Sequence, residues 1–85
     1  MLELYQFEEC PYCVRVRKKL SELEVDFISR NVPRKKDDRK MLIKVSGQDG
    51  VPTLVDTDKG IVIADDDDRI IHYLEEEYEK NGKNR

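Results

Sequence analysis

Segments with strand-like and helix-like patterns alternate along this chain, and their order constrains the fold more than any other feature. Residues 2–7 carry mixed, β-prone side chains that suit a strand covered on both faces. Residues 12–24 then place apolar side chains at helical spacing, and residues 25–32 resemble a second strand. A helix between two strands predicts that they pair in parallel through a right-handed crossover.

Residues 36–46 predict a second helix, which carries Met41, Leu42 and Val45 on one face. Gly47 follows this run and suits a helix stop, because glycine adopts the left-handed backbone conformation at low cost.

Two short β-like runs, residues 53–56 and 60–64, follow and are joined by a turn, which predicts an antiparallel hairpin. The last segment is a helix that begins near the four aspartates at 65–68, with an apolar stripe at Ile70, Ile71, Leu74 and Tyr78. The complete order, βαβαββα, predicts an α/β domain with one four-stranded mixed sheet flanked by helices.

The length of 85 residues fits one domain. We expect the domain to span residues 1–80 and residues 81–85 to form a disordered tail. No apolar run approaches the roughly 20 residues of a membrane span, and the N-terminus lacks the basic region of a signal peptide. Two cysteines without a targeting signal favour a reducing, cytoplasmic compartment. We expect a monomer without membrane partners.

The net charge of −3, with both signs interspersed, argues against a nucleic-acid partner, since such proteins usually carry a basic excess. Basic residues do gather locally at 15–19 and 34–40. Solvated helix faces are the favoured interpretation of both clusters. Steering of anionic substrates is the alternative.

Both cysteines lie in Cys10-Pro11-Tyr12-Cys13, between the first strand and the first helix. Pro11 suits the first turn of a helix, where free N–H groups and the positive dipole end stabilise a thiolate. We expect Cys10, at the exposed end, to be the nucleophile, with N–H contacts to its sulfur from Tyr12 and Cys13. Cys13 heads the buried helix face one turn later and would resolve a mixed disulfide.

Three other interpretations of this cysteine pair compete. Half of a zinc site would need further ligands, and the other strong candidate is the single His72. A structural disulfide would add little stability, because it closes a very short loop. Chance spacing is the third. A non-catalytic module that coordinates zinc or an iron–sulfur cluster between two chains is therefore the alternative function. The redox interpretation requires no metal.

The motif at residues 10–13 is similar to the active site of dithiol glutaredoxins. Val51-Pro52 resembles the segment before the third strand of thioredoxin-fold proteins, where the proline is cis and faces the cysteines. The resemblance covers nearly the whole chain and implies a thioredoxin-like fold. It also implies a glutathione-dependent thiol–disulfide oxidoreductase that reduces protein disulfides or glutathione mixed disulfides. The backbone of Val51 would then pair with the substrate, and Tyr12 would pack over the substrate or the sulfur.

Residues 51–56, with Ile70, Tyr73 and Leu74, also resemble the N-terminal domain of glutathione transferases. Those enzymes carry an additional helical domain, for which these 85 residues leave no room. We therefore expect a domain that lies between the two families.

Two features depart from the glutaredoxin pattern. Glu8 and Glu9 stand where glutaredoxins commonly carry a cation that contacts the glycine carboxylate of glutathione. Exposed acids there would oppose a thiolate, each by a few tenths to about 1 kcal/mol. Compensating charge would come from the second helix: Arg34, Lys35, Lys36, Arg39 or Lys40.

The other departure is the run Ala64-Asp65-Asp66-Asp67-Asp68, which replaces the Gly-Gly found before the last helix in glutaredoxins. Capping and dipole matching at the helix N-terminus are the favoured role of these aspartates. The alternative is that one aspartate pairs with the γ-glutamyl ammonium of glutathione. Asp66 and Asp67 are the residues expected to do so.

Overall fold

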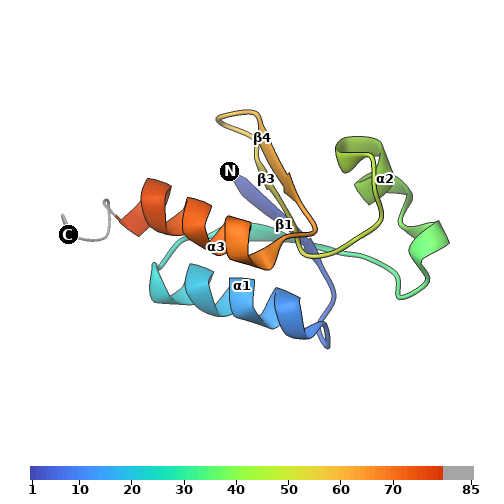
Figure 1. The fold of residues 1–85 in the computed structure, drawn as a ribbon, viewed down its shortest axis with the longest axis horizontal. Coiled ribbons are helices and arrows are strands. Elements are labelled where there is room, and N and C mark those ends of the chain that lie inside the picture. The colour runs from blue at the N-terminus through green and yellow to red at the C-terminus, as the bar shows by residue number, and fades with distance from the viewer. Residues whose placement is uncertain (80–85) are drawn as a thin grey trace.

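The computed structural model describes residues 1–79 and confirms the predicted order of strands and helices (Figure 1). The expected disordered tail, residues 81–85, lies outside the described residues. The elements are β1 Leu2–Gln6, α1 Pro11–Glu22, β2 Phe27–Asn31, a 3₁₀ turn Lys36–Asp38, α2 Lys40–Ser46, β3 Thr53–Asp56, β4 Ile61–Ala64, α3 Asp67–Leu74 and a π-helical segment Glu75–Glu79.

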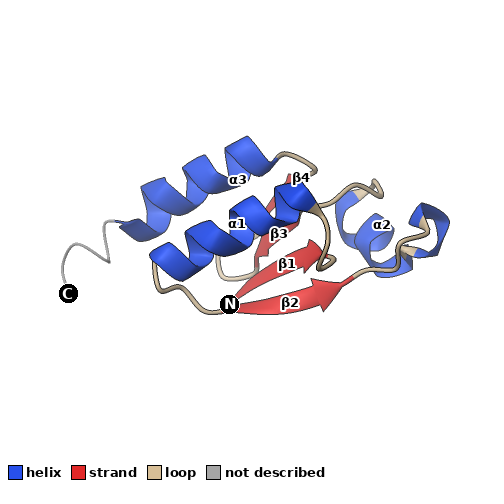
Figure 2. Ribbon diagram, turned by 90° about the horizontal axis from the view of Figure 1, so that it is seen from below, coloured by secondary structure: helices blue, strands red, loops and turns tan. Residues whose placement is uncertain are grey.

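The sheet has four strands in the order β2-β1-β3-β4. β1 pairs in parallel with β2 and β3 pairs antiparallel with β4, as predicted. β1 also pairs antiparallel with β3. Figure 2 shows α1 and α3 side by side over the sheet, whereas α2 lies apart from them beyond the carboxyl ends of β1 and β2. The sheet is therefore mixed and flanked by helices, which is the thioredoxin-like arrangement.

The core lies between the sheet and the pair α1–α3. The apolar stripe predicted for the last helix is confirmed, because Ile70 and Leu74 are fully buried, and Ile71 and Tyr78 pack against the core. The strands and α1 supply its remaining buried residues: Leu2, Leu4, Val16, Leu20, Leu54 and Ile63. This core fixes the start of α1 beside the end of β1, where the two cysteines lie.

The predicted helix over 36–46 is wrong as a continuous element. A 3₁₀ turn and α2 are separated at Arg39, whose backbone is not helical (φ −83°, ψ 58°). The Arg39 side chain is buried and donates hydrogen bonds to the carbonyls of Pro33, Arg34 and Asp49. These bonds hold the arginine in place and interrupt the helix.

The expectation of a shared apolar face on this helix is also wrong. Leu42 is buried, whereas Met41 is 57% and Val45 38% exposed. The reason is that α2 has only seven residues and lies at the end of the sheet rather than over its centre. The predicted stop is confirmed, since Gly47 caps the helix at φ 74°.

Within residues 1–79 no helix combines the length and the apolar character that crossing a lipid bilayer requires.

Candidate functional site

The two cysteines form the N-terminal turn of α1. Cys10 is the N-cap residue, Pro11 opens the helix, and the Cys13 N–H donates a hydrogen bond to Cys10 Sγ at 3.2 Å. Both thiols are free. Of the two predicted contacts to this sulfur, the one from Cys13 is present. Among residues 1–79 the Tyr12 N–H makes no such bond, because Cys10 Sγ caps the turn through the third residue after it.

The expected exposure of Cys10 is wrong. Its residue is only 4% exposed, although Cys13 is buried further, at 0%. The Cys10 N–H donates to the carbonyl of Phe7 at 3.2 Å, so the preceding loop turns tightly over the start of α1. The sulfur therefore faces its own helix turn rather than open solvent. Tyr12, between the two cysteines, is 59% exposed.

The burial of Cys13 separates the two thiols chemically. Burial, reinforced by the hydrogen bond and charge interaction with Cys10, raises the pKa of the Cys13 thiol to about 12. Cys13 consequently keeps its proton at neutral pH. A thiol that stays neutral beside Cys10 is suited to be the resolving thiol, which reacts only after Cys10 has formed a mixed disulfide.

The two glutamates before Cys10 are paired with arginines. Glu8 Oε1 lies 3.7 Å from Arg17, and Glu9 forms an ion pair with Arg34. Arg17 also donates to the backbone carbonyls of Phe7 (3.4 Å) and Glu8 (3.0 Å). It therefore holds the loop that leads to Cys10 and offsets part of the acidic charge there.

Sequence reasoning missed this role of Arg17 and assigned it to the solvated outer side of the helix. The signal was its spacing. Arg17 follows Cys13 by four residues, which places both on one helix face.

The five cations expected to compensate the acids from the second helix differ in their partners and in their exposure. Arg34 pairs with Glu9, and the buried Arg39 is bonded to carbonyls. The guanidinium carbons of both lie near the ring of Phe7, 5.4 and 5.5 Å from its centroid. The other three candidates, Lys35, Lys36 and Lys40, are exposed.

A small pocket of about 160 Å³ adjoins the cysteine motif. It brings together four of the predicted substrate-binding residues, and its complete lining is Tyr12, Val51, Pro52, Asp65 and Asp67. The Val51–Pro52 peptide bond is cis, as the resemblance implies. The lining carries two carboxylates and no cation, so it suits a positively charged group such as an ammonium.

The aspartates before α3 divide into different roles. Asp66 lies outside the pocket lining and caps the helix, its carboxylate accepting a hydrogen bond from the Arg69 N–H at 3.1 Å. Asp67 lines the pocket and forms an ion pair with Arg15, which also bonds Asp68 at 2.8 Å. Of the two aspartates expected to meet the γ-glutamyl ammonium, Asp67 lies in the pocket lining and Asp66 does not.

Asp65 is the pocket residue that sequence reasoning missed. It has the left-handed backbone conformation (φ 53°), and its N–H donates to Thr53 Oγ1 at 3.3 Å. Its carboxyl group packs so closely on Gly50 that a Cβ at this glycine would clash with it. The signal for this packing was the glycine directly before Val51-Pro52.

A metal site has no geometric support within residues 1–79, where no group of three His, Cys, Asp or Glu side chains gathers closely enough to hold an ion. His72, the candidate third ligand, lies exposed on α3, with Nε2 3.8 Å from Glu76 Oε1.

Known proteins resemble this chain both in sequence and in fold. A family model described as Glutaredoxin matches residues 2–61. An uncharacterized glutaredoxin-like 8.6 kDa protein in the rubredoxin operon of Clostridium pasteurianum is 29% identical over 63 residues, which cover 74% of this chain and 83% of that protein.

Solved structures give the same fold. Glutathione S-transferase isozyme E7 of Drosophila melanogaster is 34% identical with a TM-score of 0.81, covering 94% of this chain and 36% of that one. Glutaredoxin 2 of Salmonella typhimurium, solved in complex with glutathione, is 24% identical with a TM-score of 0.75, covering 88% and 33%; this likeness shows the fold alone. The present chain spans between 17% and 40% of the length of these and similar solved chains.

Proposed function

The chain belongs to the glutaredoxin family, and from this premise we propose that it is a thiol–disulfide oxidoreductase with Cys10 as nucleophile and Cys13 as resolving thiol. Its substrates are protein disulfides or glutathione mixed disulfides, and glutathione is the reductant. We also propose that it acts as a monomer in the reducing environment of the cytoplasm.

The observation that carries the proposal is the hydrogen bond from the Cys13 N–H to Cys10 Sγ at the first turn of α1. A hydrogen bond to a charged group contributes about 1.5–3 kcal/mol, and a helix N-terminus adds about 0.3–1 kcal/mol. Exposed acids such as Glu8 and Glu9 oppose a thiolate by at most about 1 kcal/mol each, and their arginine partners reduce this further. The hydrogen bond and the helix N-terminus therefore act against these acids at Cys10 Sγ.

In the first step the Cys10 thiolate attacks one sulfur of the substrate disulfide. The substrate S–S bond breaks, one substrate thiolate leaves and takes up a proton, and a mixed disulfide forms at Cys10. This step removes the negative charge on Cys10, which is one of the causes that raise the pKa of Cys13. Loss of the first charge therefore favours deprotonation of the second thiol.

In the second step Cys13 gives up its proton and attacks Cys10 Sγ. The second substrate thiol leaves with a proton, so the substrate has gained two electrons and the protein holds a Cys10–Cys13 disulfide. Two glutathione thiols then reduce this disulfide and become glutathione disulfide. Alternatively, one glutathione resolves the mixed disulfide directly, without Cys13.

The pocket beside the motif supports the binding of glutathione by its γ-glutamyl end. Asp65 and Asp67 offer carboxylates to an ammonium group, and Val51 offers backbone groups to an extended substrate. At the other end of glutathione, the cation that would meet the glycine carboxylate is Arg34. Arg34 is exposed, and it would exchange its ion pair with Glu9 for one with this carboxylate.

Turnover of a glutathionylated peptide, with glutathione as reductant, tests the roles of the two cysteines. Cys10→Ser is expected to abolish turnover, whereas Cys13→Ser keeps part of it, because glutathione can replace the resolving thiol. Equal loss in both variants would contradict the dependence on glutathione. Intact turnover in Cys10→Ser would reverse the assignment.

A chemical measurement tests the thiolate itself. In the Cys13→Ser variant, Cys10 should react with iodoacetamide at neutral pH at least about tenfold faster than the thiol of free glutathione, since ordinary thiols are only a few per cent ionised there. Denatured protein is the control and should lose the advantage. An equal rate in the folded protein would remove the basis of the enzymatic role.

A further inference from the structure

A second cavity, of about 430 Å³, lies between the sheet and the α2 segment. Its lining consists of Tyr5, residues 29–33 and residues 38–42, and it shares no residue with the pocket at Tyr12. Its volume falls within the range of about 300–1,000 Å³ typical of small-molecule sites. The proposed dithiol chemistry uses none of these residues.

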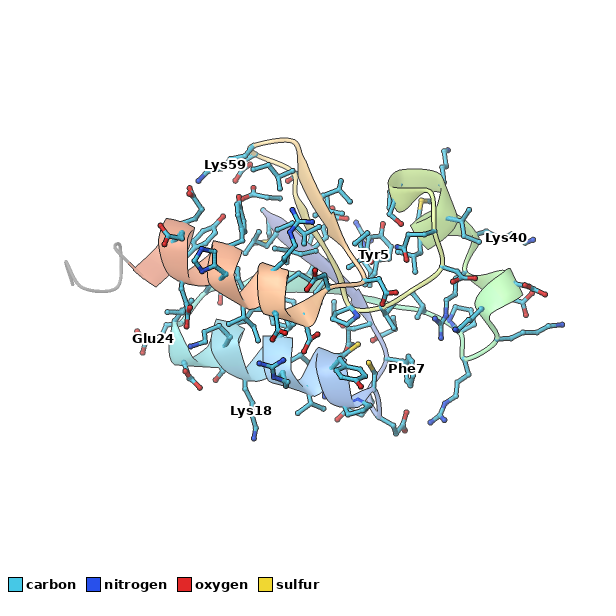
Figure 3. The ribbon with its side chains drawn as sticks, viewed as in Figure 1. Tyr5, Phe7, Lys18, Glu24, Lys40 and Lys59 are labelled. Carbon is cyan, nitrogen blue, oxygen red and sulfur yellow. The ribbon has the colours of Figure 1, made fainter. Side chains whose placement is uncertain are left out.

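The floor of the cavity contains a buried phenol. Leu4 points into the core, so its neighbour Tyr5 points to the opposite face of the sheet, toward α2 (Figure 3). Tyr5 is 4% exposed, and its hydroxyl makes no hydrogen bond with any other group of residues 1–79. Since Tyr5 lines the cavity, its hydroxyl can donate a hydrogen bond to a ligand there.

The cavity also lies over a buried positive charge. Arg39 is 4% exposed, and its guanidinium donates to three backbone carbonyls, of Pro33 (2.7 Å), Asp49 (2.8 Å) and Arg34 (3.2 Å). Within the described chain it forms no ion pair, so these carbonyls satisfy its N–H groups without neutralising its charge. Buried charges usually have a partner of opposite sign.

The rim adds further positive charge. Arg30 and Lys40 line the cavity, against the single carboxylate of Asp38. Arg30 also bonds Glu3 at 3.2 Å, which leaves Lys40 as the exposed cation with the greatest freedom to meet a ligand. Apolar walls complete the site: Val32, Pro33, Met41 and Leu42. The cavity thus combines an apolar interior with an excess of positive charge.

We propose that this cavity binds a small amphiphilic carboxylate, with an aliphatic or aromatic body. The body packs against Leu42, Met41 and the Tyr5 ring. The carboxylate accepts a hydrogen bond from the Tyr5 hydroxyl and meets Lys40 at the rim, within the field of Arg39. Cys10 does not line this cavity, so the proposal can be tested independently of the dithiol chemistry.

The test compares ligands with matched bodies and different charges. The probes are 4-phenylbutyrate, its neutral analogue 4-phenylbutanol and its cationic analogue 4-phenylbutylamine, with octanoate as the aliphatic carboxylate. Binding is followed by NMR titration of the amide signals. We expect one or both carboxylates to shift signals of residues 29–33 and 38–42, and to bind at least about tenfold more tightly than the alcohol and the amine.

Variants locate the site. Lys40→Gln and Tyr5→Phe should each weaken binding of the better carboxylate about threefold or more. Lys18→Gln is the matched control, since Lys18 projects from α1 far from α2 (Figure 3), and Cys10→Ser is the control for the dithiol. Both controls should leave binding unchanged.

Several outcomes would overturn the proposal. One is that the alcohol binds as tightly as its carboxylate analogue, because the cavity would then select for apolar character alone. Another is equal weakening by Lys40→Gln and Lys18→Gln, or shifts confined to residues around Tyr12. Failure of both carboxylates to bind below about 10 mM would also reject it.

Discussion

At the scale of single residues, Arg17 links the loop before the dithiol to the helix that carries it. Its guanidinium reaches the backbone carbonyls of Phe7 and Glu8 and the side chains of Gln6 and Glu8. The adjacent Lys18 is exposed and has no comparable contact among residues 1–79. Two neighbouring cations of one helix therefore have different roles, one positioning a loop and the other facing solvent.

Arg17→Gln should lower the free energy of unfolding by about 1–2 kcal/mol, because several hydrogen bonds to a charged donor are lost. It should also slow the reaction of Cys10 with iodoacetamide, since the loop over the sulfur loosens and a nearby cation disappears. Lys18→Gln should change stability by less than about 0.5 kcal/mol. Urea denaturation and alkylation rates measure both effects. Matching behaviour of the two variants would refute a positioning role for Arg17.

At the scale of elements, the start of α3 shows how neighbouring acids can have separate functions. Asp66 satisfies a free N–H of the first turn, whereas Asp67 and Asp68 meet Arg15 of α1 and so connect the two helices that cover the sheet. Asp65 has a left-handed backbone conformation and lines the pocket. The four acids thus provide a cap, an interhelical link and a carboxylate beside the candidate site.

Asp66→Ala should cost about 1 kcal/mol of unfolding free energy through loss of the cap, with turnover of the glutathionylated peptide nearly unchanged. Asp68→Ala, which removes an exposed ion-pair partner, should cost less. Thermal and urea unfolding measured alongside turnover separate the two effects. A large rise in the KM for the peptide with normal stability in Asp66→Ala would instead assign this residue to substrate binding.

The elements also show how far the sequence could predict the structure. β3 was predicted with its observed bounds, because strand-forming residues are enclosed there by Pro52 and a polar turn. The interrupted helix at Arg39 was not predictable, since its cause is three carbonyls brought together by the tertiary fold. The place of Asp65 in the pocket lining was not predictable for a similar reason. The contact of Asp65 with Gly50 joins segments that are distant in the sequence.

At the scale of the whole molecule, a buried carboxylate connects the end of β3 to α3 and to the π-helical segment that follows it. Asp56 Oδ2 accepts hydrogen bonds from the hydroxyls of Tyr73 (2.6 Å) and Tyr78 (2.9 Å). Lys59 Nζ lies 5.7 Å from the centroid of the Tyr78 ring, and Lys59 pairs with Glu77. β3, the β3–β4 turn and the π-helical segment are thereby held together.

These contacts predict how stability depends on pH. Burial opposes the charged form of Asp56, but the hydrogen bonds from Tyr73 and Tyr78, together with the backbone and charge of Lys59, hold the pKa of this carboxyl below its ordinary value. Its contribution is therefore present above about pH 4 and is lost as the pH falls through the folded pKa. Burial raises the pKa of Tyr78 and that of Cys13 to about 12 each. Their contribution is present below the ordinary values and is lost as the pH rises toward 12.

Tyr73→Phe should lower the free energy of unfolding by about 1.5–3 kcal/mol at neutral pH, because a hydrogen bond to a buried carboxylate is lost. The part of the stability that is lost in acid should also be smaller than in the unmodified protein, because the folded pKa of Asp56 rises toward its ordinary value. Tyr12→Phe, which alters an exposed ring, should change neither quantity. Urea denaturation across the pH range measures both. An unaltered acid profile in Tyr73→Phe would show that Asp56 does not control it.

The central place of β1 in the sheet has a consequence for synthesis. β1 begins at residue 2, yet it pairs on one edge with residues 27–31 and on the other with residues 53–56. During translation the partner of its first edge is synthesised early, whereas the partner of its second edge follows only when β3 leaves the ribosome. A bare strand edge recruits other strands, so the interval between these two pairings is when nascent chains are most exposed to aggregation with one another.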